Sequence, residues 1–569
     1  MNGIGVSPGI SIGKAYLFKK TEISVSGNIL ENDEDKQIES EKFKKAVSDS
    51  IAGIEAFKLN KSFPTDREEI EILETQIEFL SDPQIESDVL DKINNEFKTA
   101  GDAVIEVIAA AAQMLRNIED EYISARASDI QDIGNRILNH LNNNFSAMNL
   151  SGKDNIVIAE DISPSDTITF DITKIAGFAT ILGGKTSHTA IIAKAKGIPA
   201  VVGCGAGLAK IEENDTVIID GSTGEVIIRP DQNTIKSYIE KQKIFAEVNA
   251  LLKTLKNISP ITTDGHKINL YANISSAVDL GQVFENGGEG VGLLRSELLF
   301  MGRTSFPNEE EQFQFYKQVA VNSGNNPVVV RTLDIGGDKH LPYFKIPPET
   351  NPFLGYRAIR ICLDQKEIFI TQLKAILRAG IFGKLKIMFP MICNADEVKQ
   401  AKGCVQEAME ELTTSGIEFD RNTELGIMIE IPSAALMADI LAKEVDFFSI
   451  GTNDLCQYTL AVDRMNNKIS ELYTHFNPGV LRLIYNVTEQ AHKHKKHVGL
   501  CGEMASDPLA TLLLLGMGLD EFSMGAASIP AIKNIIIRNS MSDAREVCRK
   551  VMKMENSVTI TSYLKEVMR

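Results

Sequence analysis

From residue 266 onward, short apolar runs alternate with stretches of helical periodicity, and this alternation restricts the fold more than any other feature. Eight runs are largely apolar: Ile268–Asn273, Gly290–Arg295, Val328–Asp334, Lys386–Pro390, Gly426–Pro432, Asp446–Gly451, Val498–Gly502 and Glu521–Met524. Runs without regular polar alternation are typical of parallel strands that are buried on both faces. Eight strand–helix units in about 300 residues predict a TIM (β/α)8 barrel.

The part of the chain before residue 230 has a different pattern. Residues 3–18 and 151–229 hold the short apolar runs of a smaller α/β unit, whereas residues 21–150 contain few glycines and prolines and show helical periodicity. This helical block has 27 acidic and 12 basic residues, which is most of the net charge of −18. We predict an all-α insertion between strands of the α/β unit, followed by one polar helix over 231–256 that links to the barrel. The predicted fold class is therefore α/β multidomain.

Composition excludes several classes of protein. An acidic chain lacks the positive surface of a nucleic-acid binder. Seven cysteines, an odd number with no C-x-x-C pair, argue against a disulfide framework and favour a reducing compartment. The N-terminal residues lack a basic segment followed by an apolar run, and no apolar run is long enough to cross a bilayer. We therefore expect a cytoplasmic protein that binds neither nucleic acid nor membrane.

Polar residues stand at the ends of five predicted barrel strands, where the active site of such a barrel lies. Glu430 and Asp454, with Asn453 beside them, suit a hard cation such as Mg²⁺. Arginine forks suit phosphate and carboxylate groups. Four arginines stand at these ends or in the loops beyond: Arg295, Arg331, Arg357 and Arg464. The set predicts a small, multiply anionic ligand that carries a phosphate; the alternative is a set of structural salt bridges at the barrel rim.

Cys501 also stands at a strand end, beside Gly502 and Glu503. A thiol with a pKa of about 8.5 can give up a proton at neutral pH. A lone cysteine more often packs than reacts, and only its position among the other strand ends makes Cys501 a candidate. We expect the remaining six cysteines to pack.

A further candidate site is the segment Gly183–Ala193, in which two glycines follow a strand and polar residues begin a helix. Thr186 or Ser187 can cap that helix, and its first N–H groups then face an anion. His188 lies in the first turn, where the helix dipole favours a neutral imidazole and an anionic adduct. The pattern fits a phosphorylated histidine and a capped loop with a surface histidine equally well. The tract from His492 to His497 is interpreted as a solvated, basic helix terminus.

Long motifs in this chain resemble those of Enzyme I, the phosphoenolpyruvate–protein phosphotransferase family of the phosphoenolpyruvate:sugar phosphotransferase system. The resemblance covers essentially the whole chain, and the motifs stand in the family's order: GIGVSPGISIGKA, DEYISARASDIQDIGNRIL, GGKTSHTAIIAKAKGIPAVVG, GVGLLRSELLFM, RTLDIGGDKHLPYF, NPFLGYRAIR, MFPMI, IEIPSA, DFFSIGTNDLCQYTLAVDR, LCGEMASD and LLLLGMGLDEFSM. The departures are mild: Lys185 replaces a common arginine, and His475 lies in the unusual loop Tyr473–Asn477.

The resemblance implies a role for each matching residue. His188 would be the phosphorylated histidine, with Thr167 orienting it, and Cys501 would protonate the enolpyruvate carbon to give pyruvate. Phosphoenolpyruvate would be bound by the strand-end set Arg295, Arg331, Arg464 and Asn453, with Arg357 and Asp454 beside them. Mg²⁺ would be bound by Glu430 and Asp454. The acidic helices would dock the small carrier protein HPr, and the barrel would form a homodimer.

The expected domains follow from the resemblance together with the change of pattern along the chain. They are a phosphohistidine α/β subdomain (1–20 and 148–230), a helical HPr-binding subdomain (21–147), a linker helix (231–260) and a phosphoenolpyruvate-binding, dimerising barrel (261–569). Because the histidine and the anion site lie in different domains, we expect a rigid-body swing about residues 229–262, with a further hinge near residues 20 and 150.

Four rival functions are weighed against this one. A pyruvate,phosphate dikinase or phosphoenolpyruvate synthase would need a nucleotide-binding domain before the histidine domain, and a nitrogen-regulatory relative would need an N-terminal sensor domain. A docking protein without turnover would be expected to have lost part of the polar set. A Mg²⁺-dependent lyase acting on pyruvate enolates would leave His188 unexplained.

Overall fold

The computed structural model describes the whole chain except residues 19–26, 59–75, 117–120, 143–149, 151, 163–165, 167–169, 185–186, 302, 338, 340, 465, 467 and 569. The chain forms two compact units, Met1–Val248 and Asn249–Arg569. In the described part, no helix is both long and apolar enough to cross a membrane.

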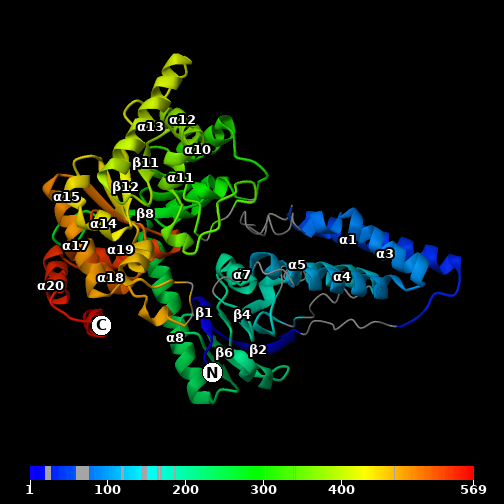
Figure 1. Cartoon of the computed structure of the whole chain (residues 1–569). Coiled ribbons are helices and arrows are strands. Elements are labelled where there is room, and N and C mark those ends of the chain that lie inside the picture. Colours follow the sequence, from blue (N-terminus) through cyan, green and yellow to red (C-terminus); the bar gives the residue numbers. More distant parts are fainter. Residues whose placement is uncertain are drawn as a thin grey trace. The chain divides into compact units, whose positions relative to one another are not determined.

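The second unit is a closed barrel of eight parallel strands, as predicted (Figure 1). The strands are β8 (Asn269–Ile274), β9 (Val291–Arg295), β10 (Val328–Arg331), β11 (Leu385–Phe389), β12 (Leu425–Ile429), β13 (Phe447–Ile450), β14 (His497–Leu500) and β15 (Glu521–Met524). Each strand pairs with the next, and β15 closes the barrel on β8. Five strands stop earlier than their apolar runs, and just beyond three of these strand ends lie Asp334, Glu430 and Cys501.

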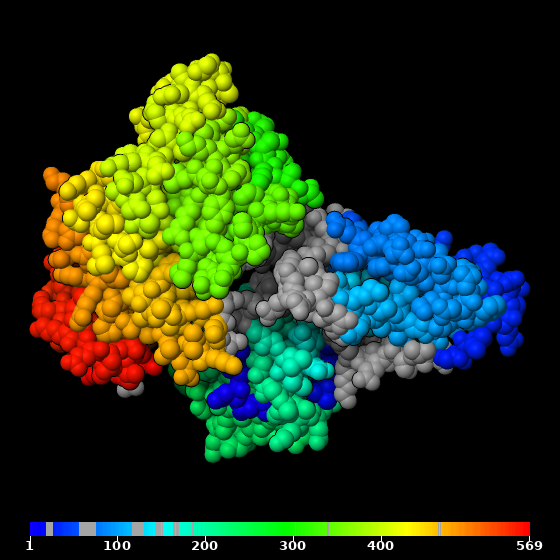
Figure 2. Space-filling model, in the orientation of Figure 1, coloured from blue at the N-terminus to red at the C-terminus, as the bar shows by residue number. Residues whose placement is uncertain are grey.

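Helices surround these strands. They are α9 (Leu280–Glu285), α10 (Glu309–Ser323), α11 (Ile359–Asp364), α12 (Lys366–Ala379), α13 (Ala395–Thr414), α14 (Pro432–Leu436), α15 (Ala438–Leu441), α16 (Thr452–Leu460), α17 (Pro478–Lys493), α18 (Pro508–Met517), α19 (Ile529–Arg538), α20 (Met541–Val551) and α21 (Ser557–Val567). Side-chain caps fix several helix starts: Asn477 and Asp507 cap helices that begin with proline, which suits the first helical position. The end of α13 stands out from the barrel surface (Figure 2).

The first unit contains a seven-stranded sheet in the order β1-β5-β4-β3-β2-β6-β7. Its strands are β1 (Ile4–Ser7), β2 (Ile10–Phe18), β3 (Asn155–Ala159), β4 (Ile175–Thr180), β5 (Ala200–Val202), β6 (Thr216–Asp220) and β7 (Glu225–Ile228). The parallel neighbours β2 and β3 are joined by the whole helical block, because parallel strands need a crossover connection. The predicted all-α insertion in an α/β unit is confirmed.

The inserted block consists of α1 (Asp33–Lys58), α3 (Pro83–Glu96), α4 (Ala100–Arg116) and α5 (Glu121–Leu141). It has its own apolar core, in which Phe43, Ile54 and Ile93 are almost completely buried. A Cβ added at Gly134 of α5 would lie 2.6 Å from the Ile108 side chain of α4, so these two helices approach closely only because residue 134 is glycine.

A single long helix, α8 (Gln232–Thr254), leads from the first unit into the second. It continues as a short 3-10 helix at Leu255–Asn257. The ammonium group of the buried Lys533 in α19 donates to the carbonyls of Leu255 and Lys256, at 3.3 Å each, and to that of Gly287 at 2.8 Å. The end of the linker is therefore fixed to the barrel unit by a buried lysine.

Candidate active site

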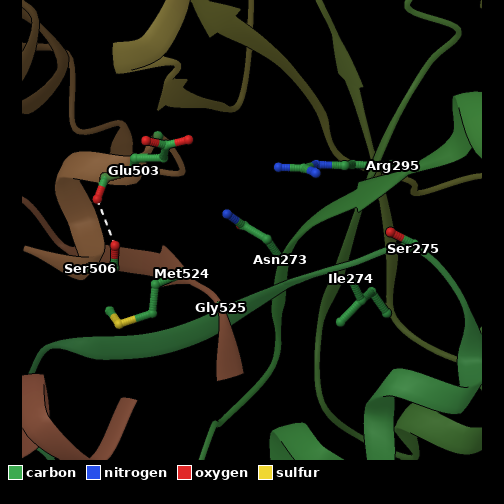
Figure 3. Close-up of a pocket in the computed structure, with 9 residues that line it drawn as sticks. Asn273, Ile274, Ser275, Arg295, Glu503, Ser506, Met524 and Gly525 are labelled. Atoms are coloured by element: carbon green, nitrogen blue, oxygen red, sulfur yellow. Dashed lines mark hydrogen bonds between the residues drawn. The ribbon is translucent and has the colours of Figure 1, made fainter. Parts of the chain in front are cut away.

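A cavity of about 230 Å³ opens at the carboxyl ends of β8, β9, β14 and β15 (Figure 3). Arg295 and Glu503 reach into it from opposite sides, and the amide of Asn273 lies between them. Within the described residues, no carboxylate forms an ion pair with Arg295, and its side chain is exposed. This cavity, which we call the mouth pocket, therefore has an arginine available for an anion.

The neighbouring Arg331, at the end of β10, is almost fully buried. Its guanidinium contacts Glu297, which follows β9, and lies 3.1 Å from the carboxylate of Asp334. Lys339 joins the same two carboxylates, at 2.8 Å from Glu297 and 3.0 Å from Asp334. Burial alone would raise the pKa of Asp334, but the cations Arg331 and Lys339 hold that pKa below its usual range.

The chain of charged contacts continues around the barrel through Asp334. Arg357 lies 3.1 Å from Asp334 and 3.5 Å from Asp454, and its Nη1 donates to the Tyr458 hydroxyl at 3.1 Å. Arg464 lies 3.7 Å from the other oxygen of Asp454. A Cβ added at Gly336 would lie 2.6 Å from the Cβ of Arg357, so the glycine turn, with φ of 95°, lets this arginine reach the site. Arg331, Arg357 and Arg464 thus stand in one connected cluster of charged contacts, and Arg295 stands outside it.

Glu430 is buried directly after β12, and one carboxylate oxygen accepts the N–H of Met391 at 2.6 Å. Met391 has a left-handed backbone, with φ of 58°, a conformation that costs energy in a non-glycine residue and is often found at functional sites. Burial, followed by the charges of Asp454 and Asp334, raises the pKa of Glu430 to about 8. The negative charge of Asp454 therefore acts on Glu430, although the charges of Arg331 and Arg357 partly offset it.

Two buried carboxylates whose like charges act on each other suit a divalent cation. Oδ1 of Asp454 is buried and has no hydrogen-bond donor among the described residues, although Arg464 lies 3.7 Å away. The described residues form no group of three or more histidine, cysteine or acidic ligands. A pair of carboxylates without further protein ligands fits Mg²⁺, which keeps waters and substrate oxygens in its shell.

Cys501 follows β14 and is 4 % exposed. Its thiol packs in the barrel interior with Met388, Met428 and Phe447, and its Sγ lies 3.8 Å from the carbonyl of Ile450. Burial raises the pKa of the thiol to about 11, an effect that Ser449 partly offsets. The thiol pKa is thus above the ordinary value that the sequence suggested, and a raised pKa keeps Cys501 protonated at neutral pH.

Two other predicted residues have structural partners. Asn453 lies at the start of α16, and its side-chain oxygen accepts the N–H of Glu503 at 3.0 Å, so it positions a wall of the mouth pocket. Nε2 of His475 lies 3.0 Å from Oδ2 of Asp507, and the His475 ring contacts the Phe476 ring edge to face. His475 is thus engaged with the loop before α18.

The predicted helix of the first unit is α7 (His188–Lys196), with Ser187 as its N-cap. The hydroxyl of Ser187 accepts the N–H of Ala190 at 3.4 Å, and Gly183 has φ of 105°. His188 is therefore the first helical residue, as expected. Thr167 lies outside the described residues.

Sequence reasoning did not assign roles to Glu297, Lys339 and Tyr458. Lys339 and Glu297 stand in motifs at strand ends, which was an available signal. The sequence carries no signal for their pairing, because Glu297 and Lys339 are 42 residues apart in the chain.

Comparison with known proteins covers the whole chain. Residues 2–126, 151–224 and 249–541 match family models described as PEP-utilising enzyme N-terminal, mobile and PEP-binding domains, respectively. A phosphoenolpyruvate-protein phosphotransferase of Bacillus subtilis (strain 168) is 44 % identical over 100 % of both chains. Proteins with the same name are 44 % identical in Priestia megaterium (99 % of this chain, 98 % of the relative) and 43 % identical in Staphylococcus carnosus (100 % and 98 %).

Proposed function

The chain belongs to the phosphoenolpyruvate-protein phosphotransferases, and we propose that it moves the phosphoryl group of phosphoenolpyruvate to its own His188 and then to a histidine of HPr. The observation that supports the first step is the mouth pocket, where Arg295, which pairs with no carboxylate among the described residues, ends the strand next to that of the buried Arg331. The buried carboxylates Glu430 and Asp454 follow strands of the same barrel. Phosphoryl transfer depends mainly on positioning and on charge neutralisation, which this arrangement supplies.

Arg295 would bind the anionic substrate directly, because it is the exposed cation of the pocket. Arg331, Arg357 and Arg464 are held by carboxylates and would present fixed positive charge without rearranging as negative charge moves. Asn453 would position Glu503 at the rim. The rim is thus preorganised by salt bridges. Anion binding and structural salt bridges, the two alternatives for these residues, are therefore compatible.

Glu430 and Asp454 would hold Mg²⁺, and the bound ion would neutralise part of the negative charge of the phosphoryl group. The orphaned oxygen of Asp454 and the raised pKa of Glu430 are the features that support this assignment. The substrate's own oxygens would complete the coordination.

His188 would attack the phosphorus, so that a nitrogen–phosphorus bond forms as the bond to the enol oxygen breaks. The electron pair of that bond remains on the pyruvate enolate. Cys501 would then give its thiol proton to the enolate carbon and later recover a proton from solvent. A pKa of about 11 keeps the thiol protonated until an enolate, a stronger base, is formed.

The helical block would dock HPr. The first turn of α1 presents Asp33, Glu34 and Asp35, in a block that carries most of the negative charge of the chain. A basic partner surface is expected to approach such a block by electrostatic steering. The mobile α/β subdomain would carry His188 between the barrel and this partner.

We further propose a cytoplasmic homodimer formed through the barrel. All seven cysteines are free, which suits a reducing compartment. The barrel dimer is proposed from the resemblance of the chain to this family.

The test is incubation of the purified protein with phosphoenolpyruvate labelled on phosphorus, without nucleotide, with Mg²⁺ or with a chelator. We expect acid-labile label on the protein and release of pyruvate, both dependent on Mg²⁺. His188→Ala should abolish labelling, and the matched control His266→Ala, an exposed histidine in a turn of the barrel unit, should not.

The alternative outcomes are distinct. Label that appears only with AMP and pyrophosphate would support a dikinase. Label that persists in His188→Ala would contradict the proposed acceptor, and absence of label in every condition would contradict the proposed reaction.

A further inference from the structure

A groove of about 800 Å³ lies on the flank of the barrel, between α17 and α20, with the end of α18 as its floor. Figure 1 shows these three helices on the same flank. Barrel helices run back from the carboxyl ends of the strands, so the ends of α17 and α18 lie at the opposite end of the barrel from the mouth pocket. We call this cavity the flank groove. Its volume falls within the range of about 300–1,000 Å³ that small-molecule sites occupy.

The lining of the flank groove is strongly cationic. Four positive side chains face it: Lys493 from α17, Arg545 and Arg549 from α20, and Lys553 just after α20. A single carboxylate, that of Glu489, lines the same groove, and Tyr485 donates to it at 3.3 Å. Across the described residues, none of the four cations forms an ion pair. In a chain with a net charge of −18, four such cations in one groove form a concentrated positive field.

Helix dipoles do not account for this excess. Cations stabilise the last turn of a helix, which is where Lys493 and Arg549 lie. The helix ends already have backbone donors, however: the N–H of His494 contacts carbonyls at the end of α17, and that of Met552 contacts carbonyls at the end of α20. Arg545 lies a full turn before the last turn of α20, and Lys553 lies beyond its end, so dipole stabilisation explains neither of them.

The floor is apolar and lacks projecting side chains. Met517 and Cys548 are each 4 % exposed. A Cβ at Gly516 would lie 2.0 Å from the carbonyl of Ala544, so only glycine lets α18 and α20 pack this closely. Gly518 follows with φ of 93° and no side chain. A ligand can therefore rest against the floor while its anionic groups reach the cations at the rim.

The flank groove is also connected to the barrel interior. His492 lines the groove and contacts Asp520 at 3.0 Å, and Asp520 accepts the N–H of Val498 in β14 at 2.9 Å. His497 of the same strand contacts Glu521 at 3.2 Å. These contacts join the groove to β14, the strand that Cys501 follows.

We propose that the flank groove binds a small, multiply anionic ligand, a phosphate ester or polyphosphate, at a site separate from the mouth pocket. Arg545 and Arg549 stand one helical turn apart, so that two guanidinium forks can engage neighbouring phosphate oxygens. Lys493 approaches from the facing helix and closes the site from the other side.

The test is isothermal titration of the full-length protein with pyrophosphate, without Mg²⁺, and separately with ADP. The double variant Arg545→Gln/Arg549→Gln should weaken the groove event at least tenfold. The matched control is Lys550→Gln, which removes a cation from the same helix that pairs with Glu546 at 2.9 Å and does not line the groove. We expect this control to bind within twofold of the parent chain.

Tighter binding of ADP than of pyrophosphate would identify nucleotides as the favoured ligands, and equal binding would identify the polyphosphate group alone. Identical titrations of the parent chain and the double variant would overturn the proposal, as would an equal loss in Lys550→Gln. Labelling by phosphoenolpyruvate should persist in the double variant, because neither arginine belongs to the mouth pocket. Failure of the proposed phosphotransfer would thus be seen in the labelling experiment, separately from the titration.

Discussion

Replacing Asp334 by asparagine should destabilise the barrel strongly, because this buried carboxylate holds three cations together. Arg331, Lys339 and Arg357 lie at 3.1, 3.0 and 3.1 Å from its oxygens, and Asp334 is 2 % exposed. The substitution keeps the shape and removes the charge. Two buried cations, Arg331 and Arg357, and the partly buried Lys339 would then be left with fewer negative partners.

Breaking a buried ion pair by neutralising one member costs about 3–5 kcal/mol. Part of the loss is compensated here, since Glu297 still contacts Arg331 and Lys339, and Asp454 still lies 3.5 Å from Arg357. We therefore expect the lower end, about 3 kcal/mol. With a urea dependence of about 3 kcal/mol per molar for a unit of this size, the unfolding midpoint should fall by about 1 M.

The assay is urea unfolding followed by near-ultraviolet circular dichroism. The chain has no tryptophan, and eight of its eleven tyrosines lie after residue 248, so this signal reports mainly on the barrel unit. Glu309→Gln is the matched control: that carboxylate also joins two cations, Lys374 and Arg378, but is 25 % exposed. Partly exposed pairs contribute about 0–1 kcal/mol. A midpoint shift in Asp334→Asn no larger than in the control would show that the buried charge of Asp334 does not stabilise the barrel.

Four further outcomes are expected. Cys501→Ala should still transfer phosphate to His188 but form pyruvate at least about 100-fold more slowly, measured by coupled pyruvate assay; unchanged pyruvate formation would exclude the proton-donor role. Glu430→Gln should raise the Mg²⁺ concentration needed for half-maximal labelling, and an unchanged Mg²⁺ dependence would remove Glu430 from the metal site. Raising the salt concentration about tenfold, from about 0.05 M, should weaken HPr binding in a titration while labelling by phosphoenolpyruvate persists. Salt-independent binding would contradict docking on the acidic helices. Burial and the charge of Lys386 lower the pKa of His497, but a hydrogen bond to Glu521 and the charges of Glu521 and Asp520 outweigh them and raise the pKa overall. The protonated ring therefore stabilises the fold below pH 6.5, and this stabilisation is lost as the pH rises through the raised pKa. His497→Gln should abolish that loss in urea unfolding, and an unchanged pH profile would contradict it.

The architecture was predictable because its signals are local in sequence. Runs such as Val328–Arg331 are apolar without alternation, and each is followed by a helical pattern, which together indicate a buried parallel strand and its return helix. The start of α7 at His188 followed in the same way from the glycines and the capping serine before it. Strand ends were less predictable, because Asp334, Glu430 and Cys501 continue apolar runs and leave the strands only where the barrel mouth opens.

The residue types at the barrel mouth and the position of the acidic helices between two strands follow from the amino-acid sequence alone. The fold decides that Arg295 is exposed, with no carboxylate partner among the described residues, while Arg331 is buried between two carboxylates, although both arginines end a strand. It also decided that the thiol of Cys501 has a pKa of about 11. The physical reason is that burial and charge pairing depend on residues brought together from different strands, such as Arg357 and Asp454, whose proximity no local pattern encodes.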